Sequence, residues 1–227
     1  MSFRPFQPFR GFGGGAAPFS PLSLSPALWF DASALSVSDG TNLTTWPDLS
    51  GNGRHLSRAA ANGPAFRAGA VNGRPAVEFL GSGYCMATVT NGTWQTVFAV
   101  AKNGGGAGLN MLFSAPLGVD RSIRLDNSTS YRGVSPVNAN DWSAFATSEF
   151  RINGTNTDNF AAGSYHVLSS NISAPVIDAT MALSSVYGGR EWIGFIAEFI
   201  VFAGTLAGSD RQNVERYLGA KYGISVA

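Results

Sequence analysis

The alternation of apolar and polar positions divides the chain at about residue 26. From residue 27 onward, short apolar runs alternate with turns rich in Gly, Asn, Ser and Pro, which is the pattern of short strands joined by tight connections. The apolar runs predict strands at residues 28–32, 43–46, 76–80, 93–102, 109–114, 122–126, 142–152, 165–169, 180–187 and 192–203. The last run is apolar at nearly every position, so we expect a central strand covered on both faces, between two packed sheets.

Pairs of Asn or Asp with Gly mark the expected turns between these strands. An Asn-Gly pair supplies the positive φ angles that tight hairpin turns need. Such pairs occur at residues 39–40, 62–63, 72–73, 91–92 and 153–154.

A helical period appears only after the last strand. Val214, Tyr217, Leu218 and Tyr222 form one apolar stripe. Ser209, with Gln212 three residues later, predicts a capping box at the start of this helix, and Gly223 predicts its end. We expect this amphipathic helix to pack on the edge or rim of the strands, with a structural role.

Composition excludes several classes of protein. The net charge is +1, which gives no electrostatic footprint for nucleic acid. A single cysteine, Cys85, excludes a disulfide scaffold, and no apolar run approaches the roughly 18 residues that a membrane helix needs. Aromatic residues make up 12% of the chain and charged residues 13%, which is unlike a disordered protein.

Residues 1–25 differ from the rest of the chain and are expected to form a separate arm before a β domain at residues 26–227. They contain Arg4 and Arg10, no acidic residue, prolines that oppose a helix, and no apolar segment of the kind found in secretory signals. Phenylalanine recurs at every third position, at Phe3, Phe6, Phe9 and Phe12.

This spacing indicates an extended arm that docks on another protein. Polyproline II has three residues per turn, so all four rings would fall on one edge. An isolated arm cannot bury them against itself, and we expect them to fill a groove on a partner, with Arg4 and Arg10 paired to its acidic residues. The alternative is a disordered tail whose period carries no contact.

Several segments together resemble the concanavalin A-like lectin/glucanase (laminin-G-like) jelly-roll superfamily, in its phage and bacterial branch. They are residues 26–33 (PALWFDAS), 46–53 (WPDLSGNG), 72–79 (NGRPAVEF), 96–100 (TVFAV), 196–202 (IAEFIVF) and 210–224 (DRQNVERYLGAKYGI). The resemblance implies an all-β fold: an antiparallel two-sheet jelly-roll sandwich with one C-terminal amphipathic helix. It does not cover the arm, and it says little about function because such folds host enzymes, lectins and structural proteins.

Glycoside hydrolysis needs two carboxylates, which a strand can supply at alternate positions. The nearest residue of this kind is Glu198, but Ile196 and Ile200 occupy the alternate positions around it. We therefore expect no catalytic site, and we interpret Glu198 as a strand carboxylate paired with an arginine or a backbone donor.

Two other groups of polar residues are candidates for a binding site. Asp48, Ser50 and Asn52 fit either a calcium loop or ordinary Asx and Ser turns. Sugar-binding residue types occur together in one part of the chain, and the candidate glycan contacts are Trp94, Tyr131, Arg132, Asn140 and Asp141.

These observations predict a non-enzymatic structural protein of a phage particle, either a head decoration, a fibre or a tail-associated protein. The arm would bind capsid or tail proteins of the same virion, and the β domain would form a homo-oligomer or touch a host polysaccharide. We expect no cofactor, metal, nucleic acid or membrane contact, and host cytoplasm as the place of assembly. The alternatives are a free bacterial carbohydrate-binding or adhesin module and, third, a glycoside hydrolase.

Overall fold

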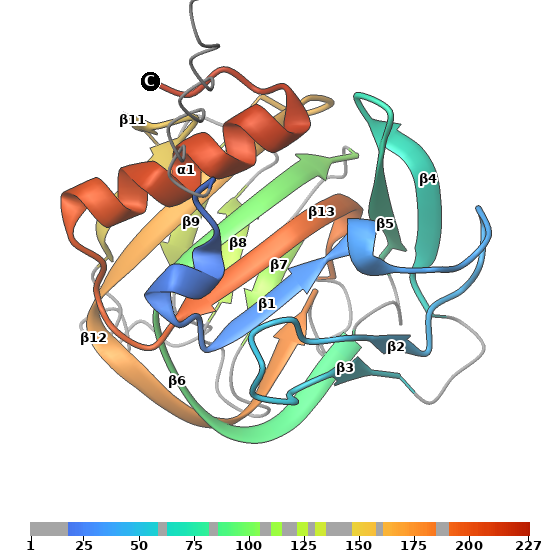
Figure 1. Cartoon of the computed structure of the whole chain (residues 1–227), viewed down its shortest axis with the longest axis horizontal. Coiled ribbons are helices and arrows are strands. Elements are labelled where there is room, and N and C mark those ends of the chain that lie inside the picture. The colour runs from blue at the N-terminus through green and yellow to red at the C-terminus, as the bar shows by residue number, and fades with distance from the viewer. Residues whose placement is uncertain are drawn as a thin grey trace, which may run out of the picture.

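A computed structural model describes residues 18–58, 63–81, 86–104, 110–114, 122–126, 130–134, 147–157, 161–184 and 191–227. Across these residues the chain forms thirteen β-strands, two short 3₁₀ helices and one α-helix near the C-terminus (Figure 1). The predicted mostly-β fold with a C-terminal helix is therefore confirmed. No helix among these residues is long and apolar enough to cross a membrane.

The elements follow one another along the chain in a fixed order. The short helices are η1 (Pro21–Leu24) and η2 (Ala32–Ala34), and the long helix is α1 (Gly208–Tyr222). The strands are β1 (Leu28–Asp31), β2 (Thr45–Trp46), β3 (Leu56–Ser57), β4 (Ala65–Val71), β5 (Arg74–Leu80), β6 (Met86–Asn103), β7 (Asn110–Ser114), β8 (Ser122–Asp126), β9 (Ser130–Val134), β10 (Thr147–Ile152), β11 (Thr155–Asn156), β12 (Tyr165–Leu183) and β13 (Ile193–Phe202).

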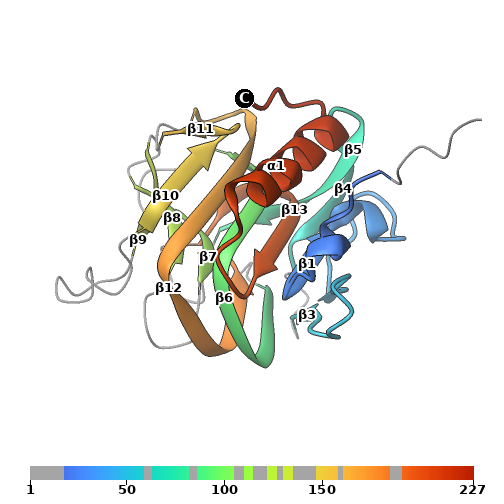
Figure 2. The ribbon, with the colours of Figure 1, turned by 60° about the vertical axis from the view of Figure 1, so that its left-hand side comes forward.

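Two long strands, β6 and β12, run through both layers of the fold. The hydrogen-bonded order is β4-β5-β13-β6-β12-β7-β8-β9, and β1 also pairs with β13. All of these strand pairs are antiparallel. Figures 1 and 2 show β6 and β12 curving together, so that one half of each strand belongs to the layer with β13 and the other half to the layer with β7. The two layers are thus joined by continuous backbone.

The core forms because side chains alternate along these strands. On β6, Val97 and Ala99 pack in the core between the layers, whereas Phe98 and Val100 pack in a second apolar cluster that includes α1. On β13, Phe199 and Ile200 divide in the same way, and both are fully buried. The prediction of a central strand covered on both faces is therefore confirmed for β13.

The helix α1 covers a face of the β13 layer rather than its rim (Figure 2). Val214, Leu218 and Tyr222 are completely buried in the outer apolar cluster, so the predicted stripe is confirmed but the predicted place was wrong. The predicted N-cap was also wrong. The helix begins at Gly208, and the residue before it, Ala207, offers no side-chain cap. Gly223 ends the helix with φ +65° as expected.

Asn-Gly pairs make turns only where the strand pairing permits them. Asn72 and Gly73 have φ angles of +48° and +79° between β4 and β5, and residues 153–154 make the corresponding turn before β11. The predicted turn at residues 91–92 was wrong, because this pair lies inside β6, where Gly92 pairs with Asp178. Long-range pairing supplies the hydrogen bonds here and overrides the local preference.

Candidate functional site

Glu198, the single carboxylate considered for catalysis, lies at the junction of β13, β1 and α1. The register of β1 on β13 places Asp31 opposite Glu198. Lys221, in the last turn of α1, reaches both carboxylates, with its Nζ 2.5 Å from Asp31 Oδ2 and 2.6 Å from Glu198 Oε2. A β-bulge between Ile196 and Glu198 marks this point of the strand. We call Asp31, Glu198 and Lys221 the carboxylate-lysine cluster.

Both oxygens of Glu198 are occupied. The indole Nε1 of Trp29 donates to Oε1 at 2.7 Å, and the hydroxyl of Tyr222 donates to Oε2 at 3.0 Å. The residue is 0% exposed. Glu198 is indeed a paired strand carboxylate, but its partners are a lysine and two aromatic side chains rather than an arginine or a backbone donor. In this arrangement it fastens the helix to the sheet, as expected for a buried carboxylate with satisfied hydrogen bonds.

Two carboxylates share one ammonium group in this cluster, and the pKa values reflect it. Burial raises the pKa of Glu198, Lys221 lowers it and Asp31 raises it again, so that it ends above its ordinary value. Burial alone would lower the pKa of Lys221, but Glu198 and Asp31 outweigh burial and raise it. We take the lysine to be firmly protonated, because it faces two acidic groups at hydrogen-bond distance.

The raised pKa values of two tyrosines near this cluster predict that the folded protein loses stability at alkaline pH. Burial, followed by the charge of Glu198, raises the pKa of Tyr217 to about 12, and the same causes raise the pKa of Tyr222 further. The folded protein therefore keeps protons that the unfolded chain releases near its ordinary tyrosine value of 10.0. Their stabilising contribution is complete below pH 10 and is lost as the pH rises toward 12 and beyond.

We expect the midpoint of thermal unfolding to be steady from pH 8 to 9.5 and to fall steeply above pH 10. A Tyr217→Phe variant has no phenol to ionise at this position, so its thermal midpoint should fall less steeply above pH 10. The change in each protein is measured relative to its own midpoint at pH 8. A midpoint that stays constant to pH 11.5 would contradict the pKa shifts.

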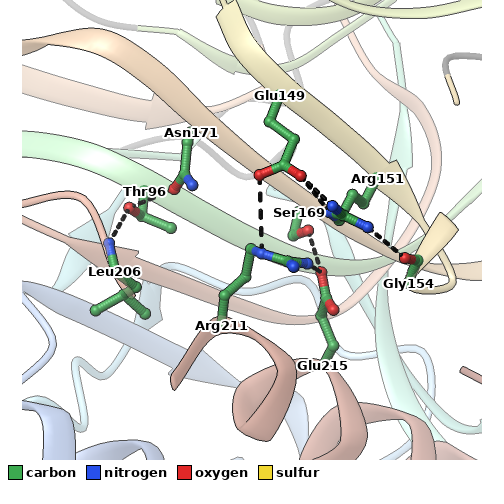
Figure 3. Close-up of polar contacts among 9 residues, drawn as sticks. All are labelled: Thr96, Glu149, Arg151, Gly154, Ser169, Asn171, Leu206, Arg211 and Glu215. Atoms are coloured by element: carbon green, nitrogen blue, oxygen red, sulfur yellow. Dashed lines mark hydrogen bonds and ion pairs between the residues drawn. The ribbon is translucent and has the colours of Figure 1, made fainter. Parts of the chain in front are cut away.

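A second polar network fastens the other end of α1 (Figure 3). Glu215 Oε1 accepts from Arg211 Nη1 at 2.6 Å and from Ser169 Oγ of β12 at 2.5 Å. Arg211 Nε lies 3.9 Å from Glu149 Oε2, and Glu149 also pairs with Arg151 on β10. Arg211 and Glu215 are 5% and 1% exposed, so this ion pair within α1 is buried at the interface between the helix and the sheet.

Sequence reasoning missed this network, although a signal for it exists. Arg211 and Glu215 are spaced i, i+4 and lie on the same helix face as Val214 and Leu218. A charged pair inside an apolar stripe points to a buried ion pair. Nearby, the Thr96 hydroxyl donates to Gly204 O at 2.8 Å and accepts from the Leu206 backbone N–H at 3.2 Å, which holds the segment that leads into α1 (Figure 3 draws Thr96 and Leu206).

The loop at Asp48 adopts the turn alternative. Asp48 Oδ1 accepts the backbone N–H groups of Trp29 and Ser50, and Oδ2 accepts that of Arg54 and the Ser50 hydroxyl. The backbone N–H of Asp48 donates to Nδ1 of His55, so the hydrogen bond between these two residues does not involve the Asp48 carboxylate. Within the described ranges, no three His, Cys, Asp or Glu residues group as metal ligands would.

Of the residues predicted for glycan contact, Trp94 is the one whose side chain the structure describes. Trp94 is 1% exposed and packs edge-on against Phe113 in the core, so its ring faces are closed to a sugar, and its selection as a contact was wrong. Tyr131 and Arg132 lie on β9, of which only the backbone is described. Asn140 and Asp141 lie outside the described residues, as do the arm residues Phe3, Arg4, Phe6, Phe9, Arg10 and Phe12.

A groove of about 520 Å³ lies where the segment before η1 meets α1. Its lining residues are Pro18, Phe19, Arg74, Asn213, Arg216, Tyr217, Ala220 and Lys221. It thus touches the exposed edge of the carboxylate-lysine cluster at Lys221. Sequence reasoning did not find the groove, because it assembles residues from three distant segments.

Comparison with known proteins supports the fold and no more. No protein-family model matches the chain, and no curated protein matches it. Among solved structures, the chain is similar to Trypanosoma rangeli sialidase in complex with sialic acid, with a TM-score of 0.56, 11% identity and coverage of 91% of this chain. A second structure of that sialidase, with a covalent 2,3-difluorosialic acid intermediate, gives a TM-score of 0.54 at 11% identity and covers 88% of this chain.

The chain spans only 34% of the length of these sialidase chains. At this identity the likeness concerns the course of the backbone. The neighbours are enzymes, but their activity belongs to chains about three times as long as the matched region.

Proposed function

We propose that this chain is a non-enzymatic structural protein of a phage particle, anchored by residues 1–25 and displaying the β domain at its surface. The proposal includes the finer fold assignment, a concanavalin A-like jelly roll. The two antiparallel layers joined by β6 and β12 support that assignment.

The observation that carries the non-enzymatic half is the state of Glu198. A hydrolytic carboxylate must reach the bond that it cleaves. Glu198 is 0% exposed, and its hydrogen bonds to Trp29 and Lys221 tie helix to sheet. The Glu198 carboxylate therefore stabilises the fold, which supports a binding or structural role for the protein.

The anchoring half is supported by the way in which the arm joins the body. Phe19 packs edge-on against Tyr217 of α1, with ring centroids 6.2 Å apart, and Leu24 packs against the outer apolar cluster. Ser20 caps η1 by accepting the backbone N–H of Leu22. The first described residues are thus fixed to the body, so a pull on the arm would be transmitted to α1 and the sheet.

Deleting residues 2–15 tests this function. We expect the truncated protein to fold with an unchanged thermal midpoint, because the deleted residues precede the fixed segment, and to be absent from purified particles. Replacing the four arm phenylalanines by alanine should reproduce the loss, and replacing Arg4 and Arg10 should weaken attachment less, because apolar burial outweighs exposed ion pairs. Particles can be separated by density gradient and probed with an antibody to the β domain.

Full retention of the truncated protein on particles would refute the anchoring half. Hydrolysis of a β-glucan that Glu198→Gln abolishes in a folded protein would refute the non-enzymatic half.

A further inference from the structure

The groove beside α1 contains two arginines for which the described residues supply no acidic partner. Arg74, at the start of β5, and Arg216, in α1, both line it and both are exposed. In the described part of the chain neither forms an ion pair, and Arg216 donates only to Gln212 Oε1 at 3.2 Å. Lys221, the third cation of the groove, is already held by Asp31 and Glu198. The two guanidinium groups are therefore available to an anion, and their planar fork suits a carboxylate.

The same groove presents aromatic and amide groups. Phe19 and Tyr217 are half-buried, with ring planes inclined at 66°, so their rings form part of the groove surface. Asn213 is exposed one helical turn before Tyr217 and can donate and accept hydrogen bonds. Aromatic walls with a few fixed polar groups are the usual lining of a small-molecule site, and 520 Å³ lies in the size range of such sites.

We propose that this groove binds a carboxylate-bearing sugar of the uronic acid type. Arg74 and Arg216 would hold the carboxylate, the ring of Tyr217 would lie against the apolar face of the pyranose, and Asn213 would bond a hydroxyl. The chain's own arm does not suit the groove, because Arg4 and Arg10 would add like charge to it. The limited volume favours one or two sugar rings over an extended acidic peptide. This site is independent of the anchoring function.

The test is isothermal titration of the full chain with trigalacturonate, alongside galactotriose as the neutral probe and hexaglutamate as the acidic peptide. We expect binding of trigalacturonate alone. Arg74→Gln and Arg216→Gln should each weaken it by about ten-fold, the effect of losing one charge-assisted contact. Arg54→Gln, an arginine outside the groove, is the matched control and should bind like the parent. All three positions are at or near the surface, so unchanged thermal midpoints are expected.

A Tyr217→Ala variant separates the aromatic contribution from the charge. It should weaken binding of trigalacturonate, whereas Tyr217→Phe should retain it. The proposal is overturned if trigalacturonate does not bind, if galactotriose binds equally well, or if the double variant of Arg74 and Arg216 keeps full affinity. Tighter binding of hexaglutamate would overturn it in favour of a protein-docking surface.

Discussion

Replacing Lys221 by methionine is expected to destabilise the folded protein by about 3–5 kcal/mol, the cost of removing one partner from a buried ion pair. The substitution leaves Glu198 fully buried and Asp31 opposite it, with no cation between two carboxylates. It also removes one of the contacts that hold α1 on the sheet. Urea unfolding at pH 7 measures the free energy of unfolding directly.

A second variant keeps this prediction specific. Adding Glu198→Gln to Lys221→Met removes one of the uncompensated charges, while the amide oxygen can still accept from Trp29 Nε1. The double variant should therefore be more stable than the single one, and the coupling should appear in a double-mutant cycle. The deficit of the single variant should also shrink as the pH falls toward 5, because protonation of Glu198 relieves the repulsion. A deficit below about 1 kcal/mol, as for an exposed ion pair, would contradict the prediction.

Gly194→Ala is expected to be the most damaging single-methyl addition in β13, at about 2–5 kcal/mol from combined backbone strain and overpacking. Gly194 has φ +138°, and an added Cβ would lie 2.1 Å from the carbonyl oxygen of Lys102 and 2.7 Å from the backbone nitrogen of Gly104. Both obstacles are backbone, so no side chain can move aside to make room.

Gly69→Ala is the matched control for this change. Gly69 is also a strand residue, in β4, but it has no atom within 4 Å of an added Cβ and no positive φ. We expect it to be neutral or slightly stabilising, because alanine restricts the unfolded chain more than glycine does. Equal urea midpoints for the two variants would show that the β13–β6 pairing adapts more easily than its geometry implies.

The sequence predicted local elements better than their pairing. The apolar run at residues 192–203 and the helical stripe ending at Tyr222 carry their own period, and both formed as expected. The runs at residues 165–169 and 180–187 were expected as separate strands, yet β12 continues from the first into the second. Pro175 falls at a shift in the register between β12 and β6, which is where a strand tolerates proline. Only the pairing partner reveals that continuity.

The candidate site lies almost wholly beyond sequence reasoning. Glu198 drew attention as an isolated carboxylate, but Lys221 and Asp31 are 190 positions apart and meet only through the register of β1 on β13 and the placement of α1 on that layer. Their residue types are unremarkable in their own segments. Residues 1–17 of the proposed arm lie outside the described residues, so for them the sequence pattern is the whole of the argument.

The position of β13 has a consequence for synthesis of the chain. This strand is built from residues 193–202 and inserts between β5 and β6, while also pairing with β1. Until residue 202 has left the ribosome, the facing edges of β5 and β6 have no strand to bond. Unpaired strand edges invite pairing between chains. During synthesis the sheet therefore has two unpaired strand edges at its centre, and they become paired only when β13 inserts between them.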